Sequence, residues 1–294
     1  MANGTGGVKA MDYVNPDSLV STGWLAANLA DTKLRIVDAS LPPAGDEGRD
    51  AKAKFAARHI PGAVFFDIDE IADRDSPLPH TMPDAKTFAA AVGALGIGNG
   101  TRVVVYDTHG LFSAGRAWWM FRAFGHDDVA ILDGGFPKWV REDRAIEPGA
   151  PQPPPARFDA RLDPAMVKDY NQVLANIESR DAQVIDARGH GRFTASIPEP
   201  RAGLRGGHIP GSVNLPYPDI LKRGDGTLLE APDLAQKFAE INIDMTRPVI
   251  TTCGSGVTAA ALVFALHLLG KDDAAVYDGS WSEWGGCEDA PVET

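Results

Sequence analysis

The sequence predicts two α/β domains in tandem, each a parallel β-sheet with helices on both faces. Three observations predict this fold: a set of motifs occurs twice in the same order, short apolar runs alternate with longer helical stretches, and a proline-rich connector separates the two halves. A chain of 294 residues is long enough for two domains that each bury a core of their own.

The duplication is visible in paired motifs at nearly constant spacing. Residues 36–39 (IVDA) pair with 184–187 (VIDA), 59–64 (HIPGAV) with 208–213 (HIPGSV), 103–107 (VVVYD) with 249–253 (VITTC), and 132–135 (LDGG) with 277–280 (YDGS). Chance can produce one such match. Several matches in the same order along the chain indicate two copies of one domain.

Each copy alternates predicted strands with predicted helices. The strands are the short apolar runs at residues 34–38, 103–106 and 130–132, then 184–186, 249–252 and 275–277. The helices are residues 85–95, 113–124, 231–241 and 257–269. This alternation is typical of a parallel sheet covered on both faces, in which ligands bind beyond the carboxyl ends of the strands.

We expect a loose tail at residues 1–10, an N-terminal domain at 11–146, a linker at 147–163 and a C-terminal domain at 164–294. The tail is Gly-rich, with a single Lys and no apolar run, which argues against a signal peptide. The linker begins with EPGAPQPPP at residues 147–155, which forms neither a helix nor a central strand. We interpret it as an extended connector over the surface.

The net charge of −12 and the pI near 5.0 argue against nucleic acid and anionic membranes as partners. Any anionic substrate must then be held by a local cluster of Arg or Lys. No apolar run is long enough to span a membrane. With two cysteines there is no disulfide framework, so we expect a reducing cytoplasm. No close His/Cys set has metal-ligand spacing, so we expect neither a metal nor another cofactor.

Cys253 lies where a predicted strand meets a predicted helix, and Gly254 and Gly256 follow within three residues. Glycines let a loop curl so that successive N–H groups point inward, and the helix N-terminus adds positive potential. Such a ring stabilises a thiolate, the reactive form of cysteine, and can also hold a sulfur atom carried on it. The alternative is an inert buried cysteine, for which this Gly-rich turn is a poor location.

The pattern CGSGVTA at residues 253–259, inside a duplicated α/β domain, resembles the tandem-domain rhodanese superfamily, and within it the 3-mercaptopyruvate sulfurtransferase branch. The likeness runs from about Val14 to Trp284 and includes GHIPG at 207–211 and YDGSW at 277–281. It implies two rhodanese-like domains, with the active site in the C-terminal one facing the N-terminal one. Thiosulfate enzymes of the superfamily usually carry basic residues directly after the cysteine, whereas mercaptopyruvate enzymes usually carry Gly-Ser-Gly, as here.

The resemblance also implies roles for residues outside the cysteine loop. Arg192 and Arg201 match the family's carboxylate-binding positions, and arginine suits a planar carboxylate. Asp69 and His80 match residues proposed to work with Ser255 in polarising the donor's keto group or moving protons. The remaining loop residues, Gly254, Gly256, Val257 and Thr258, are expected to bind substrate. Without the resemblance, the arginines and His80 would be interpreted as ordinary surface residues.

The first copy has Asp107 where the second has Cys253, and its loop is one residue longer. An aspartate cannot become a persulfide, and it puts negative charge where the second copy is suited to an anion. We therefore expect the first domain to carry no sulfur and to form one side of the active-site cleft.

Other reactive or charged positions are interpreted as structural. Arg188 follows Asp186 closely and is expected to form an internal ion pair. His59 and His208 recur in both copies although only one copy has the cysteine. Cys287 lacks a strand–loop–helix frame and is interpreted as an incidental thiol.

The expected function is transfer of sulfur from 3-mercaptopyruvate, through a Cys253 persulfide, to a thiol or cyanide, with release of pyruvate. The expected partners are a small anionic donor and a thiol acceptor such as thioredoxin or a small thiol. A thiosulfate sulfurtransferase is the main alternative. A cysteine phosphatase would need a longer loop ending in Arg, whereas this loop ends in Thr258. A non-catalytic binding module would usually lack the cysteine.

Overall fold

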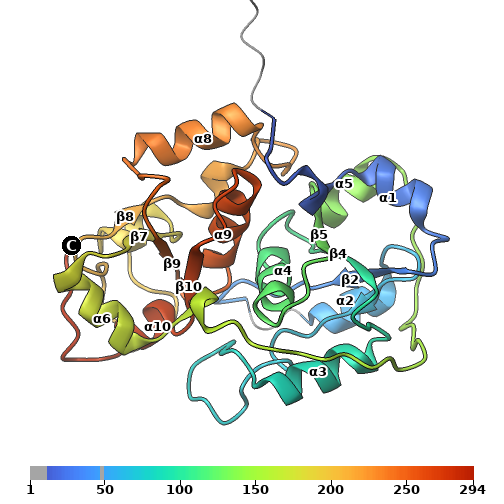
Figure 1. Ribbon diagram of the computed structural model, residues 1–294, viewed down its shortest axis with the longest axis horizontal. Coiled ribbons are helices and arrows are strands. Elements are labelled where there is room, and N and C mark those ends of the chain that lie inside the picture. The colour runs from blue at the N-terminus through green and yellow to red at the C-terminus, as the bar shows by residue number, and fades with distance from the viewer. Residues whose placement is uncertain (1–11, 47–49) are drawn as a thin grey trace, which may run out of the picture.

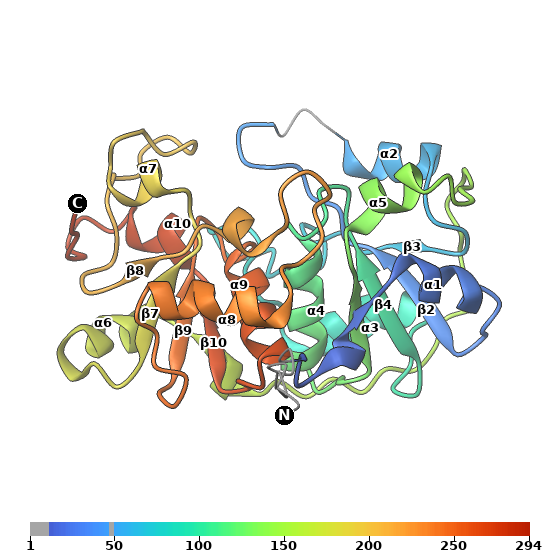
Figure 2. The ribbon, with the colours of Figure 1, turned by 90° about the horizontal axis from the view of Figure 1, so that it is seen from above.

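The computed structural model describes residues 12–46 and 50–294, and these form two domains side by side (Figures 1 and 2). The tail expected at residues 1–10 lies outside the described residues. None of the helices in the described part is long and apolar enough to cross a membrane.

The two sheets have the same topology, which confirms the duplication seen in the sequence. The first contains β1 (Leu19–Val20), β2 (Leu34–Asp38), β3 (Val64–Phe65), β4 (Arg102–Tyr106) and β5 (Val129–Leu132), in the order β1-β5-β4-β2-β3. The second contains β6 (Val167–Lys168), β7 (Gln183–Asp186), β8 (Val213–Asn214), β9 (Val249–Thr252) and β10 (Ala274–Tyr277), in the order β6-β10-β9-β7-β8. All strand pairs are parallel.

Helices cover both faces of each sheet. In the first domain they are α1 (Thr22–Asn28), α2 (Ala51–Ala57), α3 (Ala85–Ala94), α4 (Ala114–Ala123) and α5 (Gly135–Arg141). In the second they are α6 (Tyr170–Ser179), α7 (His190–Phe193), α8 (Ala231–Glu240), α9 (Ala259–Leu268) and α10 (Ser280–Trp284). Val103 and Val105 of β4 pack toward α3 and α4, whereas Val104 and Tyr106 pack toward α1, α2 and α5. This alternation follows from the two-residue period of a strand.

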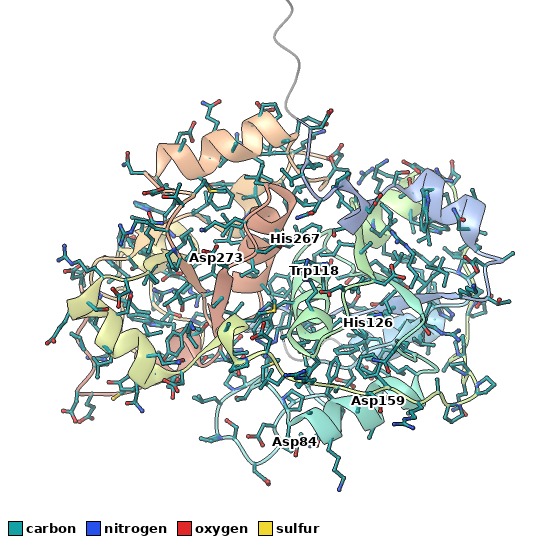
Figure 3. The ribbon with its side chains drawn as sticks, in the orientation of Figure 1. Asp84, Trp118, His126, Asp159, His267 and Asp273 are labelled. Carbon is teal, nitrogen blue, oxygen red and sulfur yellow. The ribbon has the colours of Figure 1, made fainter. Side chains whose placement is uncertain are left out.

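The domains meet where α4 packs against α9 (Figures 1 and 2). A side chain on Gly115 of α4 would begin only 2.9 Å from the backbone nitrogen of Ala261 of α9, so glycine permits this close approach. At the far end of the contact, the rings of Trp118 and His267 lie 5.1 Å apart (Figure 3). Every residue of α9 is buried, whereas a helix that covers a sheet usually exposes one face to solvent. The reason is that its own sheet covers one side and α4 of the other domain covers the opposite side.

Residues 151–163 contain no helix or strand and run as an extended segment (Figure 1). The linker passes along α3, where the N–H of Ala156 donates to the carbonyl oxygen of Gly93 at 2.9 Å. Phe158 is buried against Phe88, with ring centroids 5.8 Å apart. The connector is therefore anchored to the first domain.

The repeated histidines make matching contacts in the two domains, which supports a structural role. Nδ1 of His59 lies 2.9 Å from the carbonyl oxygen of Phe55, and its ring stacks on Phe55. Nδ1 of His208 lies 2.9 Å from the carbonyl oxygen of Phe193, and its ring stacks on Phe193. Each histidine also forms a backbone bridge to a glutamate, His59 to Glu147 and His208 to Glu293.

Candidate active site

A cavity of about 710 Å³ opens between the two domains, beyond the carboxyl ends of β2, β3, β7 and β9. It brings together nearly all of the residues predicted to be catalytic or substrate-binding: Cys253, Ser255, His80, Asp69, Arg192, Arg201, Gly254, Val257 and Thr258. Gly256 is the exception. A side chain on Gly256 would begin 2.9 Å from Nη1 of Arg116, so this glycine faces the domain interface instead of the cavity.

The cysteine loop connects β9 to α9. Cys253 is 2% exposed, and its backbone N–H donates to Oγ of Ser280 at 3.2 Å. The first residues of α10 hold the loop from behind: the N–H of Trp281 donates to the carbonyl of Cys253, and the N–H of Ser282 donates to that of Gly254, both at 2.9 Å. These carbonyls are therefore turned away from the cavity.

The opposite side of the loop is rich in free donors. Within residues 12–46 and 50–294, the backbone N–H groups of Ser255, Gly256, Val257 and Thr258 have no hydrogen-bond acceptor. Gly256 adopts φ +73°, the left-handed conformation that lets this short loop curl. Free N–H groups in a curled loop agree with the ring of amides expected from the sequence, and such a ring suits an anionic sulfur.

The matching loop of the first domain shows what fits inside such a ring. Oδ1 of Asp107 accepts the N–H of His109 at 2.7 Å, and Oδ2 accepts those of Ser113 and Ala114, both at 2.8 Å. The carboxylate of Asp107 thus occupies the centre of its own loop. This supports the expectations that the ring suits an anion and that the first domain carries no sulfur.

Arg192 and Arg201 lie directly over the cysteine loop. A Cβ atom on Gly254 would lie 3.0 Å from Nη2 of Arg192 and 3.7 Å from Nη1 of Arg201. The absence of a side chain at Gly254 therefore makes room for both guanidinium groups beside Cys253. Two cations this close to the cysteine are well placed for an anionic donor.

The two arginines differ in their other contacts. Nε of Arg192 lies 3.2 Å from both carboxylate oxygens of Glu199, and Nη2 also contacts Glu199. Arg201 has no hydrogen bond or ion pair within the described part of the chain. Its positive charge adds to the hydrogen bond from His80 in lowering the pKa of Asp69.

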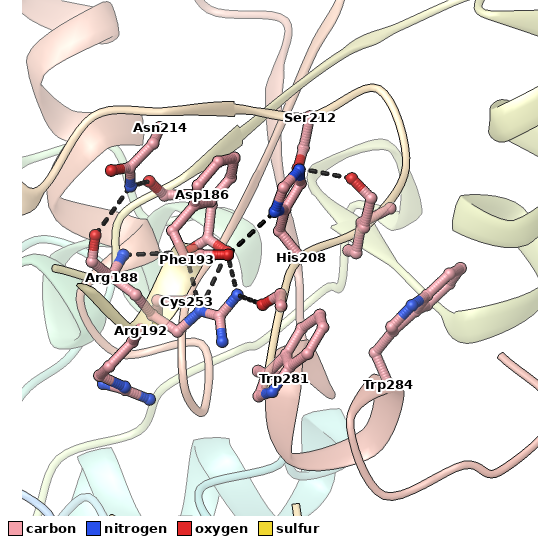
Figure 4. A network of polar contacts seen from close by, with 12 residues as sticks. Asp186, Arg188, Arg192, Phe193, His208, Ser212, Asn214, Cys253, Trp281 and Trp284 are labelled. Carbon is pink, nitrogen blue, oxygen red and sulfur yellow. Dashed lines mark hydrogen bonds and ion pairs between the residues drawn. The ribbon is translucent and has the colours of Figure 1, made fainter. Parts of the chain in front are cut away.

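Arg188 forms the internal ion pair predicted for it. Its guanidinium contacts Asp186 at 2.6 Å and stacks 4.0 Å from the ring of Trp281 (Figure 4). It also contacts Glu199 at 2.8 Å. Asp186, Arg188, Glu199 and Arg192 therefore form one chain of ion pairs, from the end of β7 to the cavity. The sequence interpretation missed Glu199, whose side chain is only 1% exposed.

His80 and Asp69 enter the cavity from the first domain. Nδ1 of His80 lies 2.8 Å from Oδ1 of Asp69, and His80 is only 9% exposed whereas Asp69 is 61% exposed. The hydrogen bond with His80 is the main cause that lowers the pKa of Asp69. His80 is therefore not a surface histidine, and it lies in the cavity that also contains Cys253 and Ser255.

The second cysteine lies apart from the cavity lining. Sγ of Cys287 is 3.6 Å from the hydroxyl of Tyr170, and both cysteines are free thiols. Among the residues that the structure describes, no group of three or more His, Cys, Asp or Glu is arranged to hold a metal ion.

Comparison with known proteins relates this site to sulfur transfer. The sequence profile described as "Rhodanese-like domain" matches residues 21–142 and 169–287. The human 3-mercaptopyruvate sulfurtransferase is 48% identical over 275 residues, covering 91% of this chain and 91% of that protein. The enzyme of the same name from Escherichia coli K12 is 43% identical over 274 residues, covering 93% and 97%.

A bovine thiosulfate sulfurtransferase is also similar, with 45% identity over 284 residues and 94% coverage of both chains. Among solved structures, the 3-mercaptopyruvate sulfurtransferase SseA from Escherichia coli superposes with a TM-score of 0.83 at 40% identity, covering 90% of this chain and 98% of that one. Overall identity therefore does not distinguish mercaptopyruvate enzymes from thiosulfate enzymes. The distinction has to come from the residues of the cysteine loop.

Proposed function

The chain belongs to the family of proteins with rhodanese-like domains, of which it has two copies, and from this membership we propose that it is a 3-mercaptopyruvate sulfurtransferase that works through Cys253. The observation that carries the choice of donor is the position of Arg192 and Arg201 over the bare backbone of Gly254. A side chain at residue 254 would press on the guanidinium of Arg192, since its Cβ would lie 3.0 Å from Nη2, so Arg192 would have to shift to admit a basic residue there. The positive charge thus lies beside the loop, where a carboxylate separated from the sulfur by two carbons can reach it.

In the first half-reaction, the Cys253 thiolate attacks the sulfur atom of mercaptopyruvate. The new S–S bond forms as the C–S bond breaks, and the electron pair of the C–S bond moves into the enolate of pyruvate. Arg192 and Arg201 bind the carboxylate, while His80 and Ser255 polarise the keto oxygen on which negative charge develops. A proton then converts the enolate to pyruvate, and the persulfide remains on Cys253.

In the second half-reaction, a thiolate or cyanide attacks the outer sulfur of the persulfide. The S–S bond breaks and the outer sulfur leaves with the acceptor. The electron pair of the S–S bond stays on Cys253, which becomes a thiolate again. The free N–H groups of the loop support both stages, because they can stabilise negative charge on either sulfur. Thioredoxin or a small thiol is the proposed acceptor.

Thiosulfate is a second, weaker donor in this proposal. The 45% identity to the bovine thiosulfate sulfurtransferase supports such an activity. The neutral Gly254-Ser255-Gly256 stretch argues that it is secondary, because thiosulfate carries its charge next to the transferred sulfur.

We further propose that the protein works in a reducing compartment such as the cytoplasm. Both cysteines are free thiols, and a persulfide intermediate needs Cys253 to remain unoxidised between turnovers.

Steady-state kinetics with the two donors test the proposed function. With cyanide as the common acceptor, kcat/KM for mercaptopyruvate should exceed that for thiosulfate, and pyruvate should appear in step with thiocyanate. Equal or better use of thiosulfate would assign the chain to the thiosulfate enzymes.

A further inference from the structure

Arg116 joins segments from both domains at the back of the active site. It lies in the first turn of α4, and its side chain is 0% exposed. Nη1 lies 2.7 Å from Oδ1 of Asp278, which follows β10 in the second domain. Nη2 donates to the carbonyl oxygen of His80 in the first domain. The guanidinium also lies 4.7 Å from the ring of Trp119.

The Arg116–Asp278 pair holds the His80 segment at two points. Arg116 binds the carbonyl of His80, and Oδ2 of Asp278 accepts the N–H of Met82 at 2.7 Å. His80 adopts φ +61°, a left-handed conformation that a non-glycine residue keeps only where its surroundings hold it. These contacts therefore maintain the backbone that directs the ring of His80 toward Asp69 and the cavity.

The same pair also lies against the cysteine loop. A side chain on Gly256 would begin 2.9 Å from Nη1 of Arg116 and 2.9 Å from the carbonyl oxygen of Asp278. Nη1 of Arg116 is 3.5 Å from the carbonyl oxygen of Gly256. One guanidinium group thus contacts the backbone on both sides of the cavity.

We propose that Arg116 and Asp278 are positioning residues, which set the His80 ring of the first domain against the cysteine loop of the second. This inference rests on the proposed function, in which His80 acts on the donor's keto group. A buried ion pair is a poor source of stability, because the desolvation of both charges offsets most of their attraction. What the ion pair provides, and a hydrophobic pair in the same place would not, is a fixed direction for its hydrogen bonds to the His80 segment.

Arg122 provides a matched control on the same helix. It also reaches the second domain, where it contacts His267 and lies 3.7 Å from Asp272, but it lies outside the cavity lining. A substitution at Arg122 therefore weakens the domain contact without touching the His80 segment.

The test compares donors in the full-length variants Arg116→Met, Arg116→Lys, Asp278→Asn and Arg122→Met, after thermal unfolding of each has been recorded. Misplacing a catalytic group by about 1 Å can cost on the order of a hundredfold in rate. Arg116→Met and Asp278→Asn should lower kcat for mercaptopyruvate by roughly ten- to a hundredfold. The loss with thiosulfate should be much smaller, because thiosulfate has no keto group. Arg116→Lys should recover stability but only part of the mercaptopyruvate rate, since lysine lacks the guanidinium fork.

Arg122→Met should leave the ratio of the two donor rates unchanged. A double-mutant cycle gives a second readout with mercaptopyruvate alone: in a His80→Asn background, Arg116→Met should cost little more. Equal losses with both donors, or additive losses in the cycle, would mean that Arg116 only holds the domains together. If Arg116→Met does not fold, the lysine variant and Asp278→Asn decide the matter by the same criteria. Failure of the proposed function would be seen separately, as poor use of mercaptopyruvate by the unmodified enzyme.

Discussion

Replacement of Arg201 by alanine tests how the donor's carboxylate is held. Arg201 lies over the cysteine loop and has no hydrogen bond or ion pair within the described part of the chain, so its whole fork is available to the donor. Loss of a charge-assisted hydrogen bond costs about 1.5–3 kcal/mol, and each 1.4 kcal/mol corresponds to about a factor of ten. Arg201→Ala should therefore lower kcat/KM for mercaptopyruvate by roughly ten- to a hundredfold, mainly by raising KM.

Arg192→Ala should have a smaller effect, at the lower end of that range. Nε and Nη2 of Arg192 already contact Glu199, so fewer of its donors face the cavity. Its loss should also lower the melting temperature, because Glu199 is buried and keeps only Arg188 as a partner. Arg201→Ala should leave the melting temperature nearly unchanged. The lysine variants should recover part of each loss, since a point charge cannot reproduce the fork.

The assay is donor kinetics with mercaptopyruvate and thiosulfate, using cyanide as the acceptor. Arg223→Ala, an exposed arginine outside the cavity lining, is the control for a general change in charge. Unchanged mercaptopyruvate kinetics in both alanine variants would refute the assignment. The carboxylate would then have to be held elsewhere, and Arg205 is a poor candidate because it binds carbonyl oxygens near the C-terminus.

Further predictions concern single residues around the cavity and in the first domain. Gly254→Lys should shift donor preference from mercaptopyruvate toward thiosulfate, because the new side chain displaces Arg192 and adds charge beside Cys253; an unchanged ratio in donor kinetics would contradict this. Glu199→Gln should lower stability by about 2–3 kcal/mol in denaturant unfolding and raise KM for mercaptopyruvate, because it breaks a buried pair with two arginines. A stable variant with normal KM would show that Glu199 does not orient Arg192. Burial raises the pKa of Asp38 from 3.8 to about 6, so the folded state binds this proton more tightly than the unfolded chain and stability falls as pH rises through that interval. Asp38→Asn should therefore raise the free energy of unfolding at pH 7.5 by up to about 3 kcal/mol. A gain of the same size at acid pH would show that the buried charge of Asp38 is not its cause.

Much of the fold and the site could be predicted because the determining patterns are local. The paired motifs at 36–39 and 184–187 mark equivalent strands, and the structure confirms their identical places in the two sheets. The Arg188–Asp186 pair was predictable because the two residues are neighbours at the end of one strand. The glycines around Cys253 indicated a tight loop from their chemistry alone.

The rest depends on how distant parts of the chain meet. No motif in the sequence marks Arg116, because its partners Asp278 and His80 come from other segments and only the docking of the domains joins them. Glu199 lies in an irregular, proline-flanked segment with no periodicity to indicate burial. The helix expected at residue 257 begins at Ala259, because the loop first turns through the left-handed Gly256.

The central claim is that Cys253 carries the transferred sulfur, and peptide mass spectrometry tests it most directly. The unmodified enzyme, Cys253→Ser and Cys287→Ser are each treated with mercaptopyruvate in the absence of acceptor and digested without reductant. The peptide containing Cys253 should gain the mass of one sulfur atom in the unmodified enzyme and in Cys287→Ser, and should lose it when cyanide is added. Cys253→Ser should gain no sulfur and should not turn over. Added sulfur on Cys287 alone, or turnover by a folded Cys253→Ser protein, would contradict the account.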